Sequence, residues 1–172
     1  KGKNTGGMGA YSPSRLINEN LENKIFDKII KPTFKGLLDL GTKYKGFLYV
    51  GLIIVENEPY LIEYNVRMGD PECQTILPTL SSDIIDIFTA CVEGKLDETP
   101  IEWSNKKSVC IVLCAEGYPE TYKKNVEIKN FEKINLDEYN FLFHAGTKNY
   151  DNKIFAVGGR VLNFISLSDD FT

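Results

Sequence analysis

The sequence predicts an α+β fold, with an antiparallel sheet and helices in its first part and a small β-rich domain in its second. Apolar residues recur at helical spacing over residues 17–40. Two apolar runs, at residues 46–55 and 60–66, flank a turn in the pattern of an antiparallel hairpin. After a polar, proline-containing stretch, strand-like runs predominate. We therefore expect two domains, at residues 1–100 and 101–172.

The helical pattern of residues 17–40 is interrupted by Pro32, which lacks a backbone N–H and disfavours a helix interior. We expect two helices or one kinked helix there, with an apolar stripe that faces the core. Asn18 or Asn20 can cap the start of this helix, and Gly41 can end it.

The run at residues 46–55 is apolar almost throughout, which is typical of a strand buried on both faces. Turn residues at 56–59 join it to a second strand. Side chains alternate between the faces of a strand, so Glu63, Asn65 and Arg67 are expected to share one face. Carboxylate and amide oxygens suit Mg²⁺, and a guanidinium suits a phosphoryl or carboxylate oxygen. The alternative is an amphipathic edge strand with a solvated polar face.

A glycine-rich loop is predicted at residues 4–13. Closely spaced glycines let a backbone approach a ligand, and successive N–H groups can form an anion-binding nest. The alternative is a flexible turn. The segment does not match the phosphate-binding pattern G-x-x-x-x-G-K-[ST].

The remaining predicted elements are one helix and a series of strands. An amphipathic helix with a serine or aspartate cap and a glycine stop is expected at residues 81–94. The strands, separated by turn residues, are expected at residues 108–114, 126–128, 139–147, 154–157 and 161–167.

The composition is that of an ordinary globular protein, with 42% hydrophobic and 26% charged residues. The net charge of −4 gives no basic excess, so we expect no nucleic-acid partner and no membrane partner. No apolar run reaches the roughly 18 residues that span a bilayer. The first residues are glycine-rich and polar, unlike an apolar signal region.

The four cysteines show no C-x-x-C spacing. Cys110 and Cys114 lie about 13 Å apart along one predicted strand, beyond the roughly 7 Å limit for a disulfide. We therefore expect reduced core thiols in a cytoplasmic protein. The single histidine, His144, follows an apolar run and has no cysteine near it in sequence, so we expect a structural role for it and no metal cluster.

The chain opens with Lys1-Gly2-Lys3 and no methionine, and it stops at residues 168–172, where a capped helix would begin. From these two features we expect the chain to be a fragment of a longer protein.

Five motifs, in order along the chain, resemble the phosphoribosylamine–glycine ligases (glycinamide ribonucleotide synthetases), which are ATP-grasp enzymes of de novo purine biosynthesis. They are Asn4–Pro13, Gly46–Tyr49, Glu63–Glu72, His144–Thr147 and Gly158–Leu162. The resemblance covers essentially the whole chain. It implies the C-terminal part of an ATP-grasp domain followed by a small β-rich C-terminal domain. In that family ATP phosphorylates the glycine carboxylate, and the amine of phosphoribosylamine attacks the glycyl phosphate to give glycinamide ribonucleotide, ADP and phosphate.

The resemblance also implies roles for individual residues. Glu63 and Asn65 match the ligands of the Mg²⁺ or Mn²⁺ that bridges the ATP phosphates. Arg67 and Asp70 are implied to be catalytic, the first at the transferred phosphoryl group and the second orienting the amine or the glycine ammonium. The implied contacts to substrate and nucleotide are Asn4, Thr5, Gly6, Gly7, Gly9, Glu72, Gly158, Gly159 and Arg160.

One position departs from the wider ATP-grasp pattern. Many of these enzymes carry a further acidic metal ligand on the strand opposite Glu63, where this sequence has Gly51. The family's N-terminal substrate-binding domain and its lid over ATP are expected to precede this region. The resemblance therefore implies that the chain alone has no useful ligase activity. The implied partners are glycine, phosphoribosylamine and ATP, for a cytoplasmic full-length enzyme that is a monomer.

Two other interpretations are open. The first is another ATP-grasp carboxylate–amine ligase or carboxylase, against which the motifs at Asn4–Pro13 and His144–Thr147 argue. The second is a non-catalytic ATP-grasp module that serves in interactions. The acidic and basic residues of the Glu63–Glu72 motif argue against that loss of activity.

Overall fold

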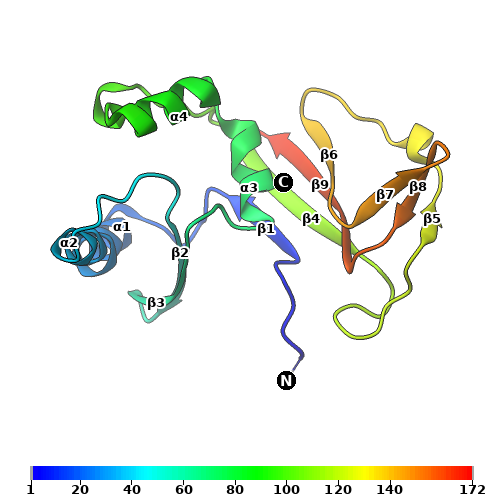
Figure 1. The fold of residues 1–172 in the computed structure, drawn as a ribbon, viewed down its shortest axis with the longest axis horizontal. Helices are drawn as coiled ribbons and strands as arrows, with labels where there is room; N and C mark the ends of the chain where they lie inside the picture. The colour runs from blue at the N-terminus through cyan, green and yellow to red at the C-terminus, as the bar shows by residue number, and fades with distance from the viewer. Residues whose placement is uncertain (1, 172) are drawn as a thin grey trace. The chain divides into compact units, whose positions relative to one another are not determined.

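The computed structural model describes residues 2–171 and divides the chain into two compact units that interleave in sequence (Figure 1). Unit 2 consists of Ser14–Gly69 and Ser81–Glu102. Unit 1 consists of the residues up to Pro13, Asp70–Leu80 and the residues from Trp103 onward. The predicted α+β class is confirmed. The predicted division into consecutive domains at residue 100 stays a prediction.

One continuous helix with a π turn in its middle forms the first part of unit 2. It comprises α1 (Glu19–Ile25), the π turn η1 (Phe26–Ile30) and α2 (Lys31–Asp39). The kink predicted from Pro32 takes this form because a proline ring clashes with the carbonyl four residues earlier. A π turn widens the helix just before that residue. Asn18 is the cap, as one of the two predicted candidates.

The end of this helix is also as predicted. Gly41 has a φ of +77°, and its N–H bonds to the Leu38 carbonyl at 2.9 Å. The N–H of Thr42 bonds to the Leu37 carbonyl at 2.9 Å. This pair of hydrogen bonds is a Schellman motif, which glycine favours because it has no Cβ.

Strands β2 (Tyr49–Val55) and β3 (Glu58–Asn65) form the predicted antiparallel hairpin. Its two-residue turn has a φ of +52° at Glu56 and +61° at Asn57, the signs that a type I′ turn requires. Ile62 has no partner in the strand register and forms a bulge.

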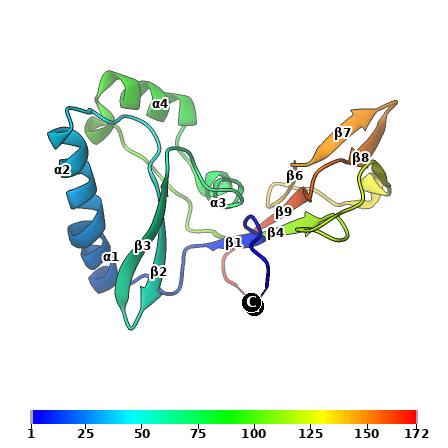
Figure 2. The same ribbon diagram turned by 60° about the horizontal axis from the view of Figure 1, so that its bottom comes forward.

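The hairpin packs against the continuous helix on one side (Figure 2). Lys24 and Lys28 both bond to the Glu58 carboxylate, and the hydroxyl groups of Thr33 and Tyr64 hydrogen-bond to each other. The helix and the hairpin are therefore joined at both ends of β3.

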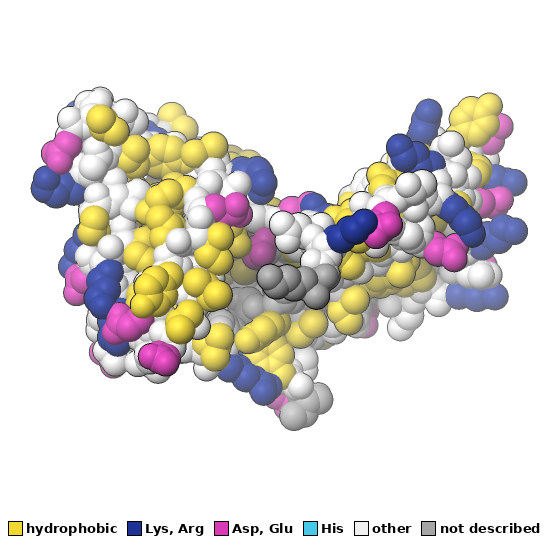
Figure 3. Space-filling view, turned by 90° about the horizontal axis from the view of Figure 1, so that it is seen from below, with side chains coloured by type: hydrophobic (Ala, Val, Ile, Leu, Met, Phe, Trp, Pro, Cys, Tyr) yellow, Lys and Arg dark blue, Asp and Glu magenta, His cyan; other side chains and the backbone are white. Residues whose placement is uncertain are grey.

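The prediction that the first strand is buried on both faces is wrong, because no residue of β2 is buried. Ile53 is 51% exposed, and Ile62 on β3 is 64% exposed. The space-filling view shows apolar side chains gathered on the surface of unit 2 (Figure 3). A near-continuous apolar run indicates only that a strand favours burial on both faces. In unit 2 the continuous helix covers the hairpin on one side only.

Helix α4 (Ile84–Glu93) completes unit 2, followed by the short η3 (Leu96–Glu98). As predicted, an aspartate caps α4, since Asp83 accepts from the N–H of Ile85 at 2.8 Å, and Gly94 ends it with a φ of +77°.

Unit 1 is built on a four-stranded antiparallel sheet of order β1-β4-β9-β6 (Figure 1). A three-stranded sheet of order β5-β8-β7 lies in the same unit. The strands are β1 (Gly9–Ser12), β4 (Lys107–Cys114), β5 (Val126–Ile128), β6 (Asn140–His144), β7 (Thr147–Tyr150), β8 (Lys153–Ala156) and β9 (Arg160–Ser168), and the helical turns are α3 (Glu72–Ile76), η2 (Leu77–Thr79) and η4 (Phe131–Lys133).

Three parts of unit 1 differ from the sequence prediction. The end of the predicted glycine-rich loop is strand β1, which pairs with β4. The single strand predicted at 139–147 is two strands, β6 and β7, separated at Ala145–Gly146. Helix α3 was not predicted, because five residues are too few to show helical periodicity.

The core of unit 1 lies in its sheet. Cys110, Val112, Ile165 and Leu167 form one buried cluster on β4 and β9. Residues of β4 alternate between buried and exposed, so this strand has one covered face.

No helix in the described part of the chain is long and apolar enough to cross a membrane.

Candidate active site

The two predicted metal ligands lie side by side on β3 in unit 2. The Asn65 amide donates a hydrogen bond from Nδ2 to Oε1 of Glu63 at 3.0 Å. The register places Gly51 of β2 opposite Glu63, as the sequence predicts. A Cβ at Gly51 would lie 3.1 Å from Cγ of Glu63, so the missing side chain leaves room beside the carboxylate.

This donor set fits Mg²⁺ bound together with phosphate. No cluster of three or more His, Cys, Asp or Glu side chains that could hold a metal occurs among residues 2–171. Mg²⁺ is commonly bound by one or two carboxylates, with substrate phosphates and water completing its shell. Glu63 and Asn65 supply oxygen donors of that kind.

Arg67 lies outside the strand, in a bend after β3. Its Nη1 donates to the Met68 carbonyl at 2.9 Å. The expectation that Arg67 shares a strand face with Glu63 and Asn65 is wrong, because β3 ends at Asn65. Beyond that residue side chains no longer alternate between the two faces of a strand.

In unit 1 the structure brings together predicted site residues from three distant segments. Nη1 of Arg160, at the start of β9, donates to the carbonyl oxygens of Gly7 at 3.1 Å and Asp70 at 2.8 Å. Nη2 of Arg160 donates to Oδ2 of Asp70 at 2.8 Å. We call Gly6, Gly7, Asp70, Gln74, Tyr118 and Arg160 the arginine cluster.

Both carboxylate oxygens of Asp70 are engaged within this cluster. Oδ2 accepts from Arg160, and Oδ1 accepts from Nε2 of Gln74 at 2.8 Å. Gln74 lies on α3, whose first residue is Glu72. The side chains therefore fix the orientation of the Asp70 carboxylate at the start of α3.

Predicted ligand-binding glycines of unit 1 are packed tightly against other parts of the chain. A Cβ at Gly7 would lie 2.4 Å from Cδ of Pro71, and one at Gly159 would lie 2.2 Å from the Tyr118 ring. The N–H of Gly6 donates to the Tyr118 hydroxyl at 2.9 Å. The absence of side chains at these positions is required by the packing of unit 1 itself.

The other predicted contact residues are placed as follows. A Cβ at Gly9 would lie 2.8 Å from the Cys110 carbonyl oxygen of the neighbouring strand, and one at Gly158 would lie 2.8 Å from Cα of Gly146. Asn4 and Thr5 are exposed.

Two family models match the chain in order along the sequence. The ATP-grasp (A) domain of phosphoribosylglycinamide synthetase matches residues 1–73, and the C domain of the same enzyme matches residues 108–172. The chain belongs to the phosphoribosylglycinamide synthetase family. The resemblance inferred from the five sequence motifs is thereby confirmed.

Curated relatives in this family carry the name phosphoribosylamine–glycine ligase. The protein of Caldanaerobacter subterraneus subsp. tengcongensis is 43% identical over 171 residues, which are 99% of this chain and 40% of that protein. The protein of Vigna unguiculata is 40% identical, over 98% of this chain and 56% of that protein. The chain thus spans about 40% of the length of the first of these relatives.

Solved structures of the family support the fold. The crystal structure of the Thermotoga maritima phosphoribosylamine–glycine ligase matches with a TM-score of 0.83 and 34% identity, over 99% of this chain and 41% of that one. A phosphoribosylglycinamide synthetase from Anaerococcus prevotii matches with a TM-score of 0.61 at 16% identity, which supports the fold alone.

Two residues of this synthetase-family chain help to hold the arginine cluster together and were not predicted from the sequence. Gln74 lies two positions after Glu72, and Tyr118 lies in a segment that the sequence predicts only to be a turn. A signal for Gln74 was its spacing of four from Asp70, which suits a side-chain bond across one helical turn. His144 bonds through Nδ1 to Thr147 Oγ1 at 2.9 Å and stacks on Phe131, consistent with the predicted structural role.

All four cysteines are free thiols, as predicted, but only Cys110 is buried. Burial raises the pKa of Cys110, and the charges of Asp70 and Glu72 raise it further, against a hydrogen bond with Thr75 that lowers it. Burial likewise raises the pKa values of Cys73 and Cys114. These three thiols are protonated at neutral pH and are poor nucleophiles.

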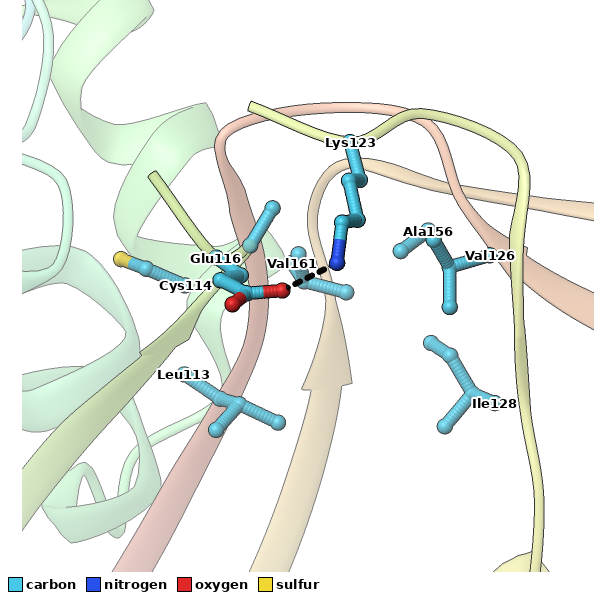
Figure 4. A pocket seen from close by; sticks show the side chains of 9 residues that line it. Leu113, Cys114, Glu116, Lys123, Val126, Ile128, Ala156 and Val161 are labelled. Carbon is cyan, nitrogen blue, oxygen red and sulfur yellow. Dashed lines mark hydrogen bonds and ion pairs between the residues drawn. The ribbon is translucent and has the colours of Figure 1, made fainter. Parts of the chain in front are cut away.

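Unit 1 also contains a cavity of about 280 Å³ beside β4 and β9 (Figure 4). Its walls are mostly apolar, and an ion pair between Glu116 and Lys123 at 2.6 Å lies among its lining residues. None of its lining residues is a predicted site residue of the family. The lining is Leu113, Cys114, Ala115, Glu116, Lys123, Val126, Ile128, Ala156 and Val161.

Proposed function

We propose that this chain is part of a phosphoribosylamine–glycine ligase, which joins glycine to 5-phosphoribosylamine at the expense of ATP. The products are glycinamide ribonucleotide, ADP and phosphate, and the intermediate is glycyl phosphate. The observation that carries this proposal is that models of two domains of one enzyme match the two ends of the chain in order. The relatives that bear the ligase name are similar over nearly all of it.

The chemistry of this reaction explains the residues on β3. Phosphoryl transfer to a carboxylate brings anions together, so catalysis consists mainly of positioning and charge neutralisation. We assign Glu63 and Asn65 to Mg²⁺ or Mn²⁺, which when bound would neutralise charge on the ATP phosphates. We assign Arg67 to the transferred phosphoryl group. The hydrogen bond between Glu63 and Asn65 supports their assignment as a pair.

The residues of unit 1 are assigned to the substrates. Asp70 and Glu72 orient the amine or the glycine ammonium, and the loop containing Asn4, Thr5, Gly6, Gly7 and Gly9 contacts a phosphate group. Gly158, Gly159 and Arg160 form the second contact region. The contacts from Arg160 to Gly7 and Asp70 support a common location for these groups.

The remaining parts of the proposal concern the whole enzyme. We place it in the cytoplasm as a monomer, with the ATP-grasp domain extending to about residue 100 and the C-terminal domain beginning at residue 101. The absence of a matched segment between residues 73 and 108 is compatible with a boundary there.

The substitution Glu63→Gln in the full-length ligase tests this function. Glutamine keeps the size of the side chain but removes its charge, so ADP formation dependent on glycine and phosphoribosylamine is expected to fall about 100-fold or more. Circular dichroism and the melting temperature should remain those of the unmodified enzyme.

The matched control is Glu56→Gln, in the hairpin turn between the same two strands. It should retain full activity. A near-normal rate for Glu63→Gln would refute the assignment of Glu63 to the metal site. Failure of the unmodified enzyme to consume ATP with these substrates would refute the proposed function itself.

A further inference from the structure

We propose that Arg160 is a positioning residue of the ligase, which fixes the glycine-rich loop and the Asp70–Glu72 turn to one another. This inference rests on the proposed function and deepens it. It changes the role of Arg160 from a contact for a substrate anion to an internal clamp on the groups that contact the substrate.

The hydrogen bonds of Arg160 carry this inference. Three bonds run from its two terminal nitrogens to Gly7 and Asp70, on two segments that lie far apart in the sequence. The planar guanidinium presents several donors in a fixed arrangement, which a lysine ammonium cannot reproduce. The side chain is 24% exposed, so most of its surface is already covered by the chain.

The other members of the cluster reinforce the same arrangement. Gln74 holds the second oxygen of Asp70, and Tyr118 accepts from the N–H of Gly6. The loop is therefore held at Gly7 by Arg160 and at Gly6 by Tyr118. An error of about 1 Å in the position of a reacting group can cost about 100-fold in rate, so such a clamp has a direct effect on catalysis.

Gly6 provides an independent way to disturb the clamp. A Cβ at this position would lie 2.8 Å from Cζ and 2.9 Å from Nε of Arg160. A free arginine side chain could move away from such a contact. Here the hydrogen bonds to Gly7 and Asp70 restrain the guanidinium, so Gly6→Ala has to weaken them.

The first experiment is a double-mutant cycle in the full-length ligase with Arg160→Ala, Asp70→Asn and both together. Loss of a charged hydrogen-bonding partner should lower kcat/KM by about 10- to 100-fold in each single variant. If Arg160 acts through Asp70, the double variant should be no more than a few-fold worse than the poorer single variant. Multiplication of the two single effects would overturn the proposal.

Chemical rescue gives a readout that a general loss of stability would not produce. Methylguanidinium should restore at least several-fold activity to Arg160→Ala and much less to the double variant, which lacks the Asp70 carboxylate. Equal rescue of both variants, or rescue of neither, would contradict the clamp.

Gly6→Ala completes the test without removing either charged group. It should lower kcat/KM several-fold in the unmodified enzyme and have no further effect in Arg160→Ala. An equal loss in both backgrounds would overturn the inference. If Arg160→Ala fails to fold, Arg160→Lys replaces it in both comparisons, since it keeps the charge and loses the planar donor arrangement.

Lys123→Ala is the matched control, because it removes an exposed ion pair with Glu116 in the same unit. It should leave kcat/KM unchanged. Activity of the unmodified enzyme with glycine, phosphoribosylamine and ATP separates the two hypotheses: its absence refutes the proposed function, whereas normal activity with additive variants refutes only the clamp.

Discussion

At the scale of single residues, the pair formed by Gly51 and Glu63 bears directly on the metal site proposed for β3. The two residues are opposite each other in the register. With no side chain on Gly51, the metal site that we propose on β3 would draw its protein ligands from Glu63 and Asn65 alone. The strength of metal binding should therefore be sensitive to any atom added at Gly51.

Replacing Gly51 by alanine in the full-length ligase should raise the Mg²⁺ concentration needed for half-maximal activity several-fold. The new Cβ would lie 3.1 Å from Cγ of Glu63, a tight contact that costs about 1 kcal/mol or more to relieve. A Mg²⁺ titration of ADP formation measures the shift. Gly36→Ala is the control, because no atom outside its own helix lies within 4 Å of its added Cβ, and it should leave the titration unchanged.

The sequence indicates that several glycines are needed, but it does not show the reason for them. Gly6, Gly7 and Gly159 were predicted to approach a ligand, and in the structure each approaches another part of the chain. Both situations exclude a Cβ, so the amino-acid type cannot distinguish them. The partners Arg160 and Tyr118 become identifiable only when the distant segments are placed together.

At the scale of elements, the helix ends were predicted best because their signals are local. Asn18, Gly41 and Gly94 each act within a few residues of their own position. Strand β1 was missed because its evidence lies in β4, its partner from another part of the sequence. The bulge at Ile62 was missed for a similar reason, since it is a property of the register between two strands.

The two asparagines near the start of α1 allow a test of capping. Asn18 accepts from the N–H of Leu21 at 3.0 Å, so Asn18→Ala should lower the free energy of unfolding by about 1 kcal/mol. Asn20 lies inside the helix, and Asn20→Ala should leave stability unchanged or raise it slightly, because alanine favours a helix interior. Urea denaturation of the chain compares the two, and equal effects would contradict the assignment of the cap.

The contact between helix and hairpin should depend on pH through Glu58. Hydrogen bonds from Lys24 and Lys28 lower the pKa of Glu58. A carboxyl group with a lowered pKa in the folded state adds stability at pH values above its ordinary pKa, and this contribution is lost as the pH falls through the lowered value. Glu58→Gln should therefore lower the melting temperature at neutral pH and have no effect in strong acid.

The surface location of Glu58 makes its effect sensitive to salt. Raising the ionic strength should reduce the difference between Glu58→Gln and the unmodified chain. Asp39→Asn, which removes a pair between neighbouring turns of α2, is the control and should change the melting temperature little. A difference that persists unchanged in acid would exclude the carboxylate as its source.

At the scale of the whole molecule, the order of the motifs carried more information than any single one. A glycine-rich loop or an alternating polar strand is common, but five motifs in a fixed order identified the family that the comparisons confirmed. The interleaving of the two units was not predicted, because linear patterns suggest boundaries between consecutive segments. Instead, the first segment of unit 1 ends at residue 13, its second covers residues 70–80 and its third begins at residue 103, and unit 2 is formed by the residues between them.

The 172-residue chain by itself should have no useful ligase activity. It spans about 40% of the Caldanaerobacter relative that carries the ligase name, and an ATP-grasp reaction needs the nucleotide enclosed and shielded from water. Purified chain mixed with ATP, Mg²⁺, glycine and phosphoribosylamine should release ADP no faster than the same mixture without protein. Robust release dependent on glycine would show that this chain holds the nucleotide unaided.

The pairing of β1 with β4 also sets the order in which the chain can fold as it is synthesised. Ser12 pairs with Ser108, so the first strand of the sheet leaves the ribosome long before its partner. At about 5–20 residues per second, roughly 5–20 seconds separate the two. All of unit 2 is made in that interval, whereas the sheet of unit 1 cannot close until β4 and then β9 have emerged. The segment that carries the glycine-rich loop must therefore remain unpaired until β4 has been made.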